Sequence, residues 1–280
     1  MESGNKKGKI ILLWVAAFIL TAATGYYQRI TGPTYSKKIT FTFDGTEYTY
    51  KLPRSHEETN CLVTLAVKDT SVNARLVYRR YNLNEKLTEI PFERKNDTLI
   101  AELPAQPASG KLEYAVIFEK EGKESFQITG HEMVVIRFKG AVPGWLVIIH
   151  VIFMFAGMFL SNITGFYAFL KHPSFTRFAL YTTVTLFIGG LILGPLVQKY
   201  AFGEYWTGVP FGWDLTDNKL ALAFIFWLGT WLLSIKVPKY KLGIAAFIVL
   251  IIMYSIPHSY MGSEYDYKSG KVGTSKEFKL

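Results

Sequence analysis

Two histidines and two aspartates are the residues of this sequence best suited to chemistry. His150 lies inside a long apolar run, and His258 follows Pro257 at the end of another. Asp214 and Asp217 fall in a polar, aromatic segment between two further apolar runs. Two imidazoles from different helices that face one cavity are what axial ligation of a b-type haem requires. Imidazoles combined with a carboxylate instead favour a divalent metal, with zinc as the natural candidate.

The two aspartates belong to a segment over residues 199–219 that is rich in aromatic residues and interrupted by Gly and Pro. It is too polar to cross lipid and too aromatic for a solvated linker. Amphipathic rings of this kind settle at the interface between membrane and water. Trp206 and Trp213 are therefore candidates to stack on a cofactor, with a place in an interfacial aromatic belt as the alternative.

Each candidate also has a structural interpretation. Asp217 or Thr216 could cap the helix that follows, because a side-chain oxygen at that position accepts from free backbone N–H groups. Asp214 could pair with a neighbouring lysine at the surface. His150 could hydrogen-bond a Ser or Thr hydroxyl across a pair of helices. A polar residue inside a membrane is nevertheless expensive, so His150 is a functional candidate by default.

Five apolar runs could place these residues in a membrane. The run over residues 145–170 is long enough to cross about 30 Å of hydrocarbon, for which roughly 20 helical residues suffice. The other runs cover residues 10–27, 178–197, 220–235 and 242–256, and the last two are near the lower length limit. The first run also fits a cleaved signal peptide, since basic residues precede a short apolar core.

Basic residues on short loops predict the orientation of the chain. Lys/Arg clusters lie at residues 6–9, 171–177 and 236–241, and five spans put all three on the cytoplasmic side. The residues between 35 and 140, the aromatic segment and the tail then lie outside. Cys61 is the only cysteine, so the outer domain has no intrachain disulfide. This favours a bacterial cytoplasmic (inner) membrane, with the outer parts in the periplasm.

Small and polar residues recur along one face of the second span. They follow one another at steps of 4, 3, 4 and 4, which places them within about a quarter of the helix circumference: His150, Met154, Gly157, Ser161 and Gly165. Such a face packs against other helices, because small residues permit close approach. Gly190 and Gly194 in the next span offer a matching surface, and Pro195 should bend or end that helix.

Residues 35–140 show the period-two alternation of strands. Asp44-Gly45 reads as a tight hairpin turn, and one predicted strand turns Leu112, Tyr114 and Val116 to the same side. About seven to nine short strands in about 100 residues, with regular turn spacing, predict an antiparallel β-sandwich. No catalytic triad, metal-spaced cluster or phosphate loop marks this domain.

The stretch ARLVYRRYNLNEKLTEIPFERKNDTLIAELPAQPASGKLEYAVIF, residues 74–118, carries a strand ending in a Tyr-Arg pair, a strand leading into Leu103-Pro104 and a strand with Tyr114. In these features it resembles immunoglobulin-like or fibronectin type III-like modules of bacterial surface and periplasmic proteins. The resemblance implies a fold and no activity. The membrane part is similar to uncharacterised bacterial membrane proteins, through the loop motif YWTGVPFGWDLTDNK.

The net charge of +9 does not mark a nucleic-acid-binding protein. Between residues 34 and 140, 16 Lys and Arg stand against 15 Asp and Glu, so the outer domain is nearly neutral. Nucleic-acid binding requires a basic face on a folded domain. We expect membrane lipids and other membrane protein subunits as partners instead.

The predicted architecture is an integral membrane α-helical protein of five spans with an extracytoplasmic, all-β, immunoglobulin-like sandwich. Its parts are an N-terminal anchor and linker (1–34), the sandwich (35–140), a four-helix transmembrane domain (141–260) and a flexible extracytoplasmic tail (261–280).

Three functions are compatible with this architecture. We favour an accessory or structural subunit of a bacterial membrane complex, with a ligand site at the outer membrane face. The first alternative is an electron-transfer subunit that binds b-type haem or quinol through His150 and His258. The second is a metal-dependent membrane enzyme in which His150, His258, Asp214 and Asp217 hold the ion. No local metal-binding motif supports the second alternative, and the sequence does not decide whether the protein is an enzyme.

Overall fold

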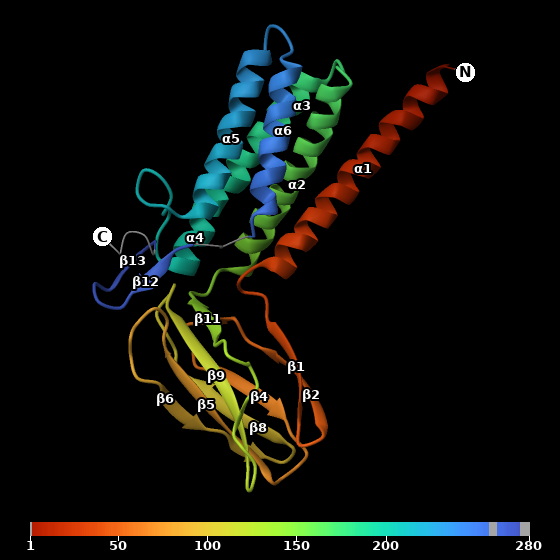
Figure 1. Ribbon diagram of the computed structural model, residues 1–280. Helices are drawn as coiled ribbons and strands as arrows, with labels where there is room; N and C mark the ends of the chain where they lie inside the picture. Colours follow the sequence, from red (N-terminus) through yellow and green to blue (C-terminus); the bar gives the residue numbers. More distant parts are fainter. Residues whose placement is uncertain (1, 258–261, 275–280) are drawn as a thin grey trace. The chain divides into compact units, whose positions relative to one another are not determined.

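The computed structural model describes residues 2–257 and 262–274 (Figure 1). The chain divides into two compact units. The helical unit comprises Met1–Pro33, Val142–Ser263 and Gly273–Leu280. The β unit comprises Thr34–Ala141 and Glu264–Val272, so its parts lie on both sides of the helical segment in the sequence.

The helical unit contains α-helices and one π-helical segment. Their bounds are α1 Glu2–Thr31, α2 Gly144–Phe169, α3 Phe175–Leu186, the π-helix η1 Phe187–Leu193, α4 Gly194–Phe202, α5 Leu215–Ser234 and α6 Tyr240–Ser255. Within the described residues, three helical segments are long and apolar enough to cross a membrane: Gly8–Thr31, Gly144–Phe169 and Phe175–Phe202. The other two apolar runs fall in α5 and in α6, which is a shorter apolar helix.

Helix α2 is the centre of the helical unit, because it packs against α1, α3 and α6, while α5 packs against α3 and α6. The predicted role of its glycines is confirmed. A Cβ added at Gly157 would lie 3.0 Å from Leu186, and one at Gly165 would lie 2.4 Å from Phe247. These glycines therefore let α3 and α6 approach α2 closely.

Pro195 does not end its helix. It lies in the first turn of α4, where a missing N–H costs least, and the turns before it widen into η1. Short π-helical segments occur as irregularities inside longer helices. The helical segment therefore continues to Phe202.

The β unit is built from short strands around one hydrophobic core. The strands are β1 Lys37–Phe43, β2 Thr46–Leu52, β3 Ser55–Glu57, β4 Cys61–Ala66, β5 Val72–Arg80, β6 Thr88–Pro91, β7 Glu93–Lys95, β8 Thr98–Leu103, β9 Lys111–Lys120, β10 Phe126–Gln127, β11 Val134–Lys139, β12 Glu264–Asp266 and β13 Lys271–Gly273. One sheet has the order β3-β11-β9-β5-β6, with β10 beside β9, and another has the order β4-β8-β7. Buried side chains from both sheets and from the β1-β2 hairpin form a single cluster.

Sequence alternation located several of these strands. Leu112, Tyr114 and Val116 of β9 are fully buried, as predicted. Asp44 and Gly45 both have positive φ, and Phe43 pairs with Thr46, so the predicted tight hairpin is confirmed. The sheets depart from an all-antiparallel pattern at one point, because β3 runs parallel to β11.

Part of the predicted tail, residues 261–280, has regular structure. Residues 264–273 form the hairpin β12-β13. The N–H of Tyr265 donates to the carbonyl of Ser109 at 3.2 Å, and the Tyr267 hydroxyl donates to Gln106 Oε1 at 2.9 Å. Lys111 forms an ion pair with Glu264. These contacts attach the hairpin to the β unit, while residues 275–280 lie outside the described part of the chain.

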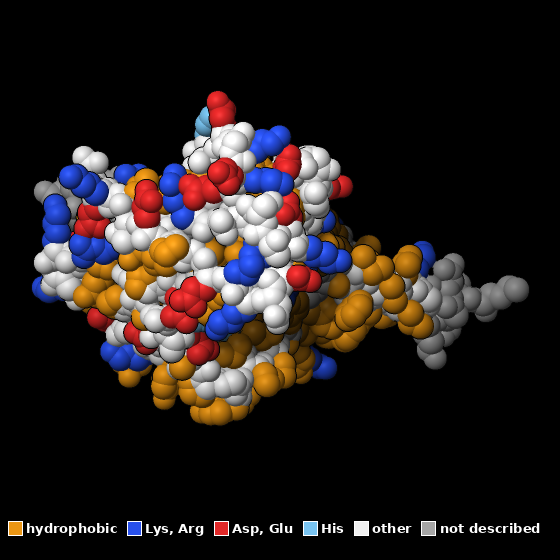
Figure 2. Space-filling view, turned by 90° about the horizontal axis from the view of Figure 1, so that it is seen from below, with side chains coloured by type: hydrophobic (Ala, Val, Ile, Leu, Met, Phe, Trp, Pro, Cys, Tyr) orange, Lys and Arg blue, Asp and Glu red, His pale blue; other side chains and the backbone are white. Residues whose placement is uncertain are grey.

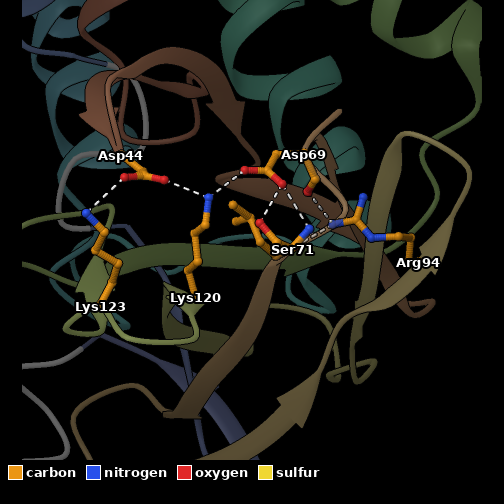
Figure 3. A network of polar contacts seen from close by, with 7 residues as sticks. Asp44, Asp69, Ser71, Arg94, Lys120 and Lys123 are labelled. Atoms are coloured by element: carbon orange, nitrogen blue, oxygen red, sulfur yellow. Dashed lines mark hydrogen bonds and ion pairs between the residues drawn. The ribbon is translucent and has the colours of Figure 1, made fainter.

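Charged side chains of both signs lie interspersed on the face shown in Figure 2, without a broad area of one sign. One ion-pair network of the β unit appears in Figure 3. Lys120 Nζ lies 2.6 Å from Asp44 Oδ2 and 2.9 Å from Asp69 Oδ2. Asp69 also accepts hydrogen bonds from the N–H and hydroxyl of Ser71. These bonds join the β1-β2 turn to β9.

Candidate functional site

The aromatic loop, residues 203–214, joins α4 to α5 and contains three of the six predicted site residues, Trp206, Trp213 and Asp214. Asp214 precedes α5, and its Oδ1 accepts a hydrogen bond from the N–H of Thr216 at 2.8 Å. Asp214 is therefore the N-cap, in place of the predicted Asp217 or Thr216. The reason is that α5 begins at Leu215, several residues before the apolar run that suggested its start.

Asp217 fastens the beginning of the aromatic loop. Its Oδ2 accepts from the N–H of Thr207 at 2.8 Å and from Gln198 Nε2 at 3.2 Å. Asn218 contributes one further bond, because its Oδ1 accepts from the N–H of Val209 at 2.7 Å. Only glycine fits at position 208, where an added Cβ would lie 2.6 Å from the Cβ of Asp217.

Asp214 and Asp217 meet at one hydroxyl. Thr207 Oγ1 lies 3.2 Å from Asp214 Oδ2 and 3.4 Å from Asp217 Oδ2. Asp214 Oδ2 also accepts from the N–H of Ser263 at 2.9 Å and from its hydroxyl at 3.0 Å. The two predicted carboxylates are therefore brought together, and neutral N–H and O–H donors surround them. Both aspartates are buried.

His150 is bonded to the backbone of η1. Its Nδ1 lies 2.9 Å from the carbonyl oxygen of Gly189. A carbonyl only accepts, so Nδ1 carries the proton, and the lone pair of the imidazole is at Nε2. The predicted hydroxyl partner is thus replaced by a carbonyl. A ring N–H held in this way is also the arrangement that orients a metal-binding histidine.

The remaining predicted site residues are Trp206, Trp213 and His258. Trp206 is half-buried and donates from Nε1 to the carbonyl of Val209 at 3.1 Å, so it packs on its own loop. Trp213 is 60% exposed. His258 lies outside the described residues, and its pairing with His150 stays a prediction. No three His, Cys, Asp or Glu side chains within the described segments are grouped as metal ligands.

Sequence reasoning missed Thr207, Gln198 and Ser263. The spacing Asp214-x-x-Asp217 resembles a capping box and could have indicated that both aspartates face the helix start. Nothing local connects Ser263 with Asp214, since 49 residues separate them. Such a contact follows from the packing of α5 and α6, which the sequence pattern does not specify.

The β unit has a second place where polar groups gather, an open cleft of about 670 Å³. The guanidinium of Arg80 lies 5.0 Å from the ring centroid of Tyr267 and donates from Nε to Glu85 at 3.1 Å. Burial raises the pKa of the Tyr267 hydroxyl to about 12, so this group keeps its proton at neutral pH. The polar groups of this cleft bond to one another, since the Tyr267 hydroxyl also donates to Gln106 Oε1.

No family model, curated protein or solved structure shows a significant match to this chain.

Proposed function

We propose that this chain is an accessory, structural subunit of a bacterial inner-membrane complex. It anchors an immunoglobulin-like sandwich on the periplasmic side through five spans. One observation carries the proposal. The hairpin β12-β13, which follows the last helix, is bonded to Ser109 and Gln106 of the same unit that precedes α2.

This contact restricts the threading. Because both ends of the segment 142–263 enter one folded unit, that segment crosses the membrane an even number of times. The segments Gly144–Phe169 and Phe175–Phe202 supply two crossings. Helices α5 and α6 then add either two crossings or none. Buried residues of α5 and α6 pack in one hydrophobic cluster with residues of α2 and α3, which supports two further crossings. With α1, the total is five, and all three basic clusters lie in the cytoplasm.

The strand order supports the immunoglobulin-like part of the proposal. In such domains, one sheet holds strands C, F and G, and strands B and E lie in the other. The order β11-β9-β5-β6 matches G-F-C with an added C′ strand, and β4-β8 matches B-E. Tyr114 near the start of β9 donates to the carbonyl of Pro53 at 2.9 Å, a longer-range bond than the usual tyrosine corner makes.

Hydrogen bonds between helices support a structural role for the membrane part. Trp227 Nε1 donates to Ser161 Oγ at 3.1 Å, and Asn162 Nδ2 donates to Thr21 Oγ1 at 2.9 Å. Such bonds are worth about 0.6 kcal/mol each on average inside membranes. They fix the positions of α1, α2 and α5 and so present a rigid surface to other subunits.

A second function, electron transfer through a b-type haem, is favoured by the tautomer of His150. Its Nδ1–H bond to Gly189 leaves the lone pair of the imidazole on Nε2, as an axial ligand requires. His258 would supply the opposite ligand. An absorption spectrum of the purified protein separates the two functions. A Soret band that disappears in both His150→Ala and His258→Ala would replace the structural proposal by the redox one.

Cysteine labelling tests the threading in a Cys61→Ser chain. Single cysteines replace Glu124 in the β unit, Lys268 in the tail and Lys239 between α5 and α6. In spheroplasts, a membrane-impermeant maleimide should label positions 124 and 268, and it should label position 239 only after permeabilisation. Labelling of position 239 in intact spheroplasts, or opposite results at 124 and 268, would reject the five-span proposal.

Blue native electrophoresis of gently solubilised membranes tests the subunit role. The protein should migrate in a discrete assembly larger than the purified chain in the same detergent. Migration of the membrane-extracted protein at the position of the purified chain would contradict that role.

A further inference from the structure

We infer that the aromatic loop is a hook that inserts sideways into the bilayer holding the helices. The side chains of Tyr205, Val209, Phe211 and Trp213 enter the headgroup and upper acyl region, and Lys199 holds lipid phosphate beside them. This inference rests on the proposed membrane insertion of the helical unit and adds a specific lipid-contacting element to it.

The first support is the reversed burial of the loop. Its large apolar side chains face outward, with exposed fractions of 54% for Tyr205, 78% for Phe211 and 60% for Trp213. Its polar residues face inward, and Thr207 and Asp214 are buried. A loop bathed in water buries the opposite set, because transfer of apolar surface out of water drives folding. The pattern suits an apolar surrounding.

The second support is rigidity. The N–H groups of Phe211 and Gly212 both donate to the carbonyl of Gly208 at 2.9 Å, and that of Asp214 donates to Thr207 at 2.9 Å. With the carboxylate bonds of Asp217, these contacts prevent the aromatic side chains from turning inward. An element ordered before binding loses little further entropy when it inserts.

The third support is position. The loop begins where the apolar segment Phe175–Phe202 ends, and Figure 1 shows it projecting sideways from the helices between α4 and α5. A loop that continued along the helix axes would point into water. Ile225 of α5 is 60% exposed, so an outward apolar surface continues along the helix that follows the loop. This continuity favours lipid over a protein partner.

The fourth support is the cation at the same place. Lys199 Nζ donates to the carbonyl of Gly203 at 2.5 Å and lies 5.2 Å from the ring centroid of Tyr205. A lysine fixed at the end of an apolar helix lies at headgroup level, where its charge attracts lipid phosphate. Tyrosine and tryptophan prefer the same level.

Spin labelling of the full chain tests the hook. In the Cys61→Ser chain, nitroxide labels are placed at Phe211→Cys, at Ile225→Cys as the lipid-facing control and at Glu124→Cys as the aqueous control. The protein is reconstituted in phosphatidylcholine vesicles. Collisions of each label with oxygen, which concentrates in lipid, are compared with collisions with a water-soluble nickel chelate. Because position 211 should lie in the headgroup and upper acyl region and position 225 deeper, we expect the label at 211 to give a ratio of oxygen to nickel collisions between those at 225 and 124, and several-fold above that at 124.

Three results would overturn the inference, and they are distinguishable from one another. A label at 211 that behaves like the one at 124, while 225 remains lipid-exposed, rejects the hook and leaves the proposed topology intact. A label at 225 that behaves like the one at 124 rejects both. Protection of 211 from the nickel chelate in native membranes but not in the vesicles would mean that a protein partner covers the loop, and it also overturns the inference.

Tryptophan fluorescence gives a second readout that tolerates local disturbance. In vesicles with lipids brominated near the headgroup end of the acyl chain, fluorescence should be quenched, and Trp213→Phe should remove more of the quenchable emission than Trp206→Phe. Two outcomes would contradict insertion of Trp213. One is an equal loss of quenchable emission in Trp206→Phe and Trp213→Phe, and the other is quenching of the wild type that is no larger than quenching of Trp213→Phe.

Discussion

Asp44 and Asp69 in the β unit meet lysine side chains at the protein surface, whereas Asp214 and Asp217 in the helical unit are buried and meet N–H and O–H groups of Thr207 and Ser263. Asp44 and Asp69 form ion pairs with lysine ammonium groups that are exposed to water. There, Coulomb attraction is weak, and two long side chains lose freedom when they pair. The second pair is partnered by neutral donors out of water, where a polar group without a partner is costly.

The surface ion pairs should therefore contribute little to the stability of the β unit, whereas the buried carboxylates should stabilise the aromatic loop. Loss of the lysine bonds leaves Asp44 and Asp69 hydrated, so the β unit keeps its core. Loss of a carboxylate in the aromatic loop leaves buried donors without an acceptor. We therefore expect mutations in the aromatic loop to reduce stability more than mutations of the surface ion pairs, and four measurements test this difference.

The largest effect should follow Asp217→Ala, which leaves the buried N–H of Thr207 without an acceptor and takes from the Gln198 amide one of its two acceptors. We expect a loss of about 1–3 kcal/mol, mainly from the unsatisfied N–H of Thr207, seen as a lower melting temperature in detergent and faster proteolysis between residues 203 and 214. Asp217→Asn is the matched control, because it keeps one acceptor oxygen and should lose less. Wild-type melting and proteolysis of Asp217→Ala would contradict a holding role.

Gly208→Ala should have the next largest effect. The new Cβ would lie 2.6 Å from that of Asp217, so one side must move, at a cost of about 1–3 kcal/mol. Gly229→Ala in α5 is the control, since nothing lies within 4 Å of its added Cβ, and alanine favours a helix. Thermal unfolding of the two variants should change in opposite directions; equal midpoints would show that the loop has room.

The effect of pH should come from the surface pair. The Lys120 hydrogen bond lowers the pKa of Asp44, and the Ser71 hydroxyl lowers that of Asp69, below the ordinary value of 3.8 for an aspartate. Their stabilisation is therefore complete above pH 3.8 and is lost as the pH falls through the folded-state pKa values. Chemical unfolding of the β unit between about pH 5 and about pH 2 should weaken less steeply in Asp44→Asn/Asp69→Asn than in the wild type. Parallel curves would contradict this assignment.

The smallest effect is expected for Lys120→Met at neutral pH. This substitution removes the exposed bridge to Asp44 and Asp69 but leaves the Ser71 bonds in place. The thermal midpoint should stay close to that of the wild type, because exposed ion pairs contribute little. A drop as large as that of Asp217→Ala would show that the comparison is wrong.

Local sequence patterns predicted the parts of this fold that depend on neighbouring residues. The Asp44-Gly45 turn requires positive φ at both positions, and this requirement is visible in the residue types. The burial of Tyr114 follows from period-two alternation, and the contact at Gly165 follows from helical spacing. In each case, the physical cause acts within a few residues.

The parts that could not be predicted depend on distant segments. The bond between Ser263 and Asp214 and the attachment of Tyr267 to Gln106 each join residues far apart in sequence. The start of α5 was misplaced because its first turn is polar, and apolar periodicity shows only where burial begins. The π-helical widening at Phe187–Leu193 was not predicted either, although Pro195, which follows it, indicated that the regular helix is disturbed there.

The hairpin β12-β13 also sets an order of events during synthesis. A ribosome makes residues 34–141 long before residues 264–272, and domains begin to fold as they emerge. The newly made β unit therefore lacks its contacts to Tyr265 and Tyr267 until α6 and the hairpin β12-β13 have left the ribosome. Closure of this unit by β12 and β13 can therefore occur only after α6 has been made.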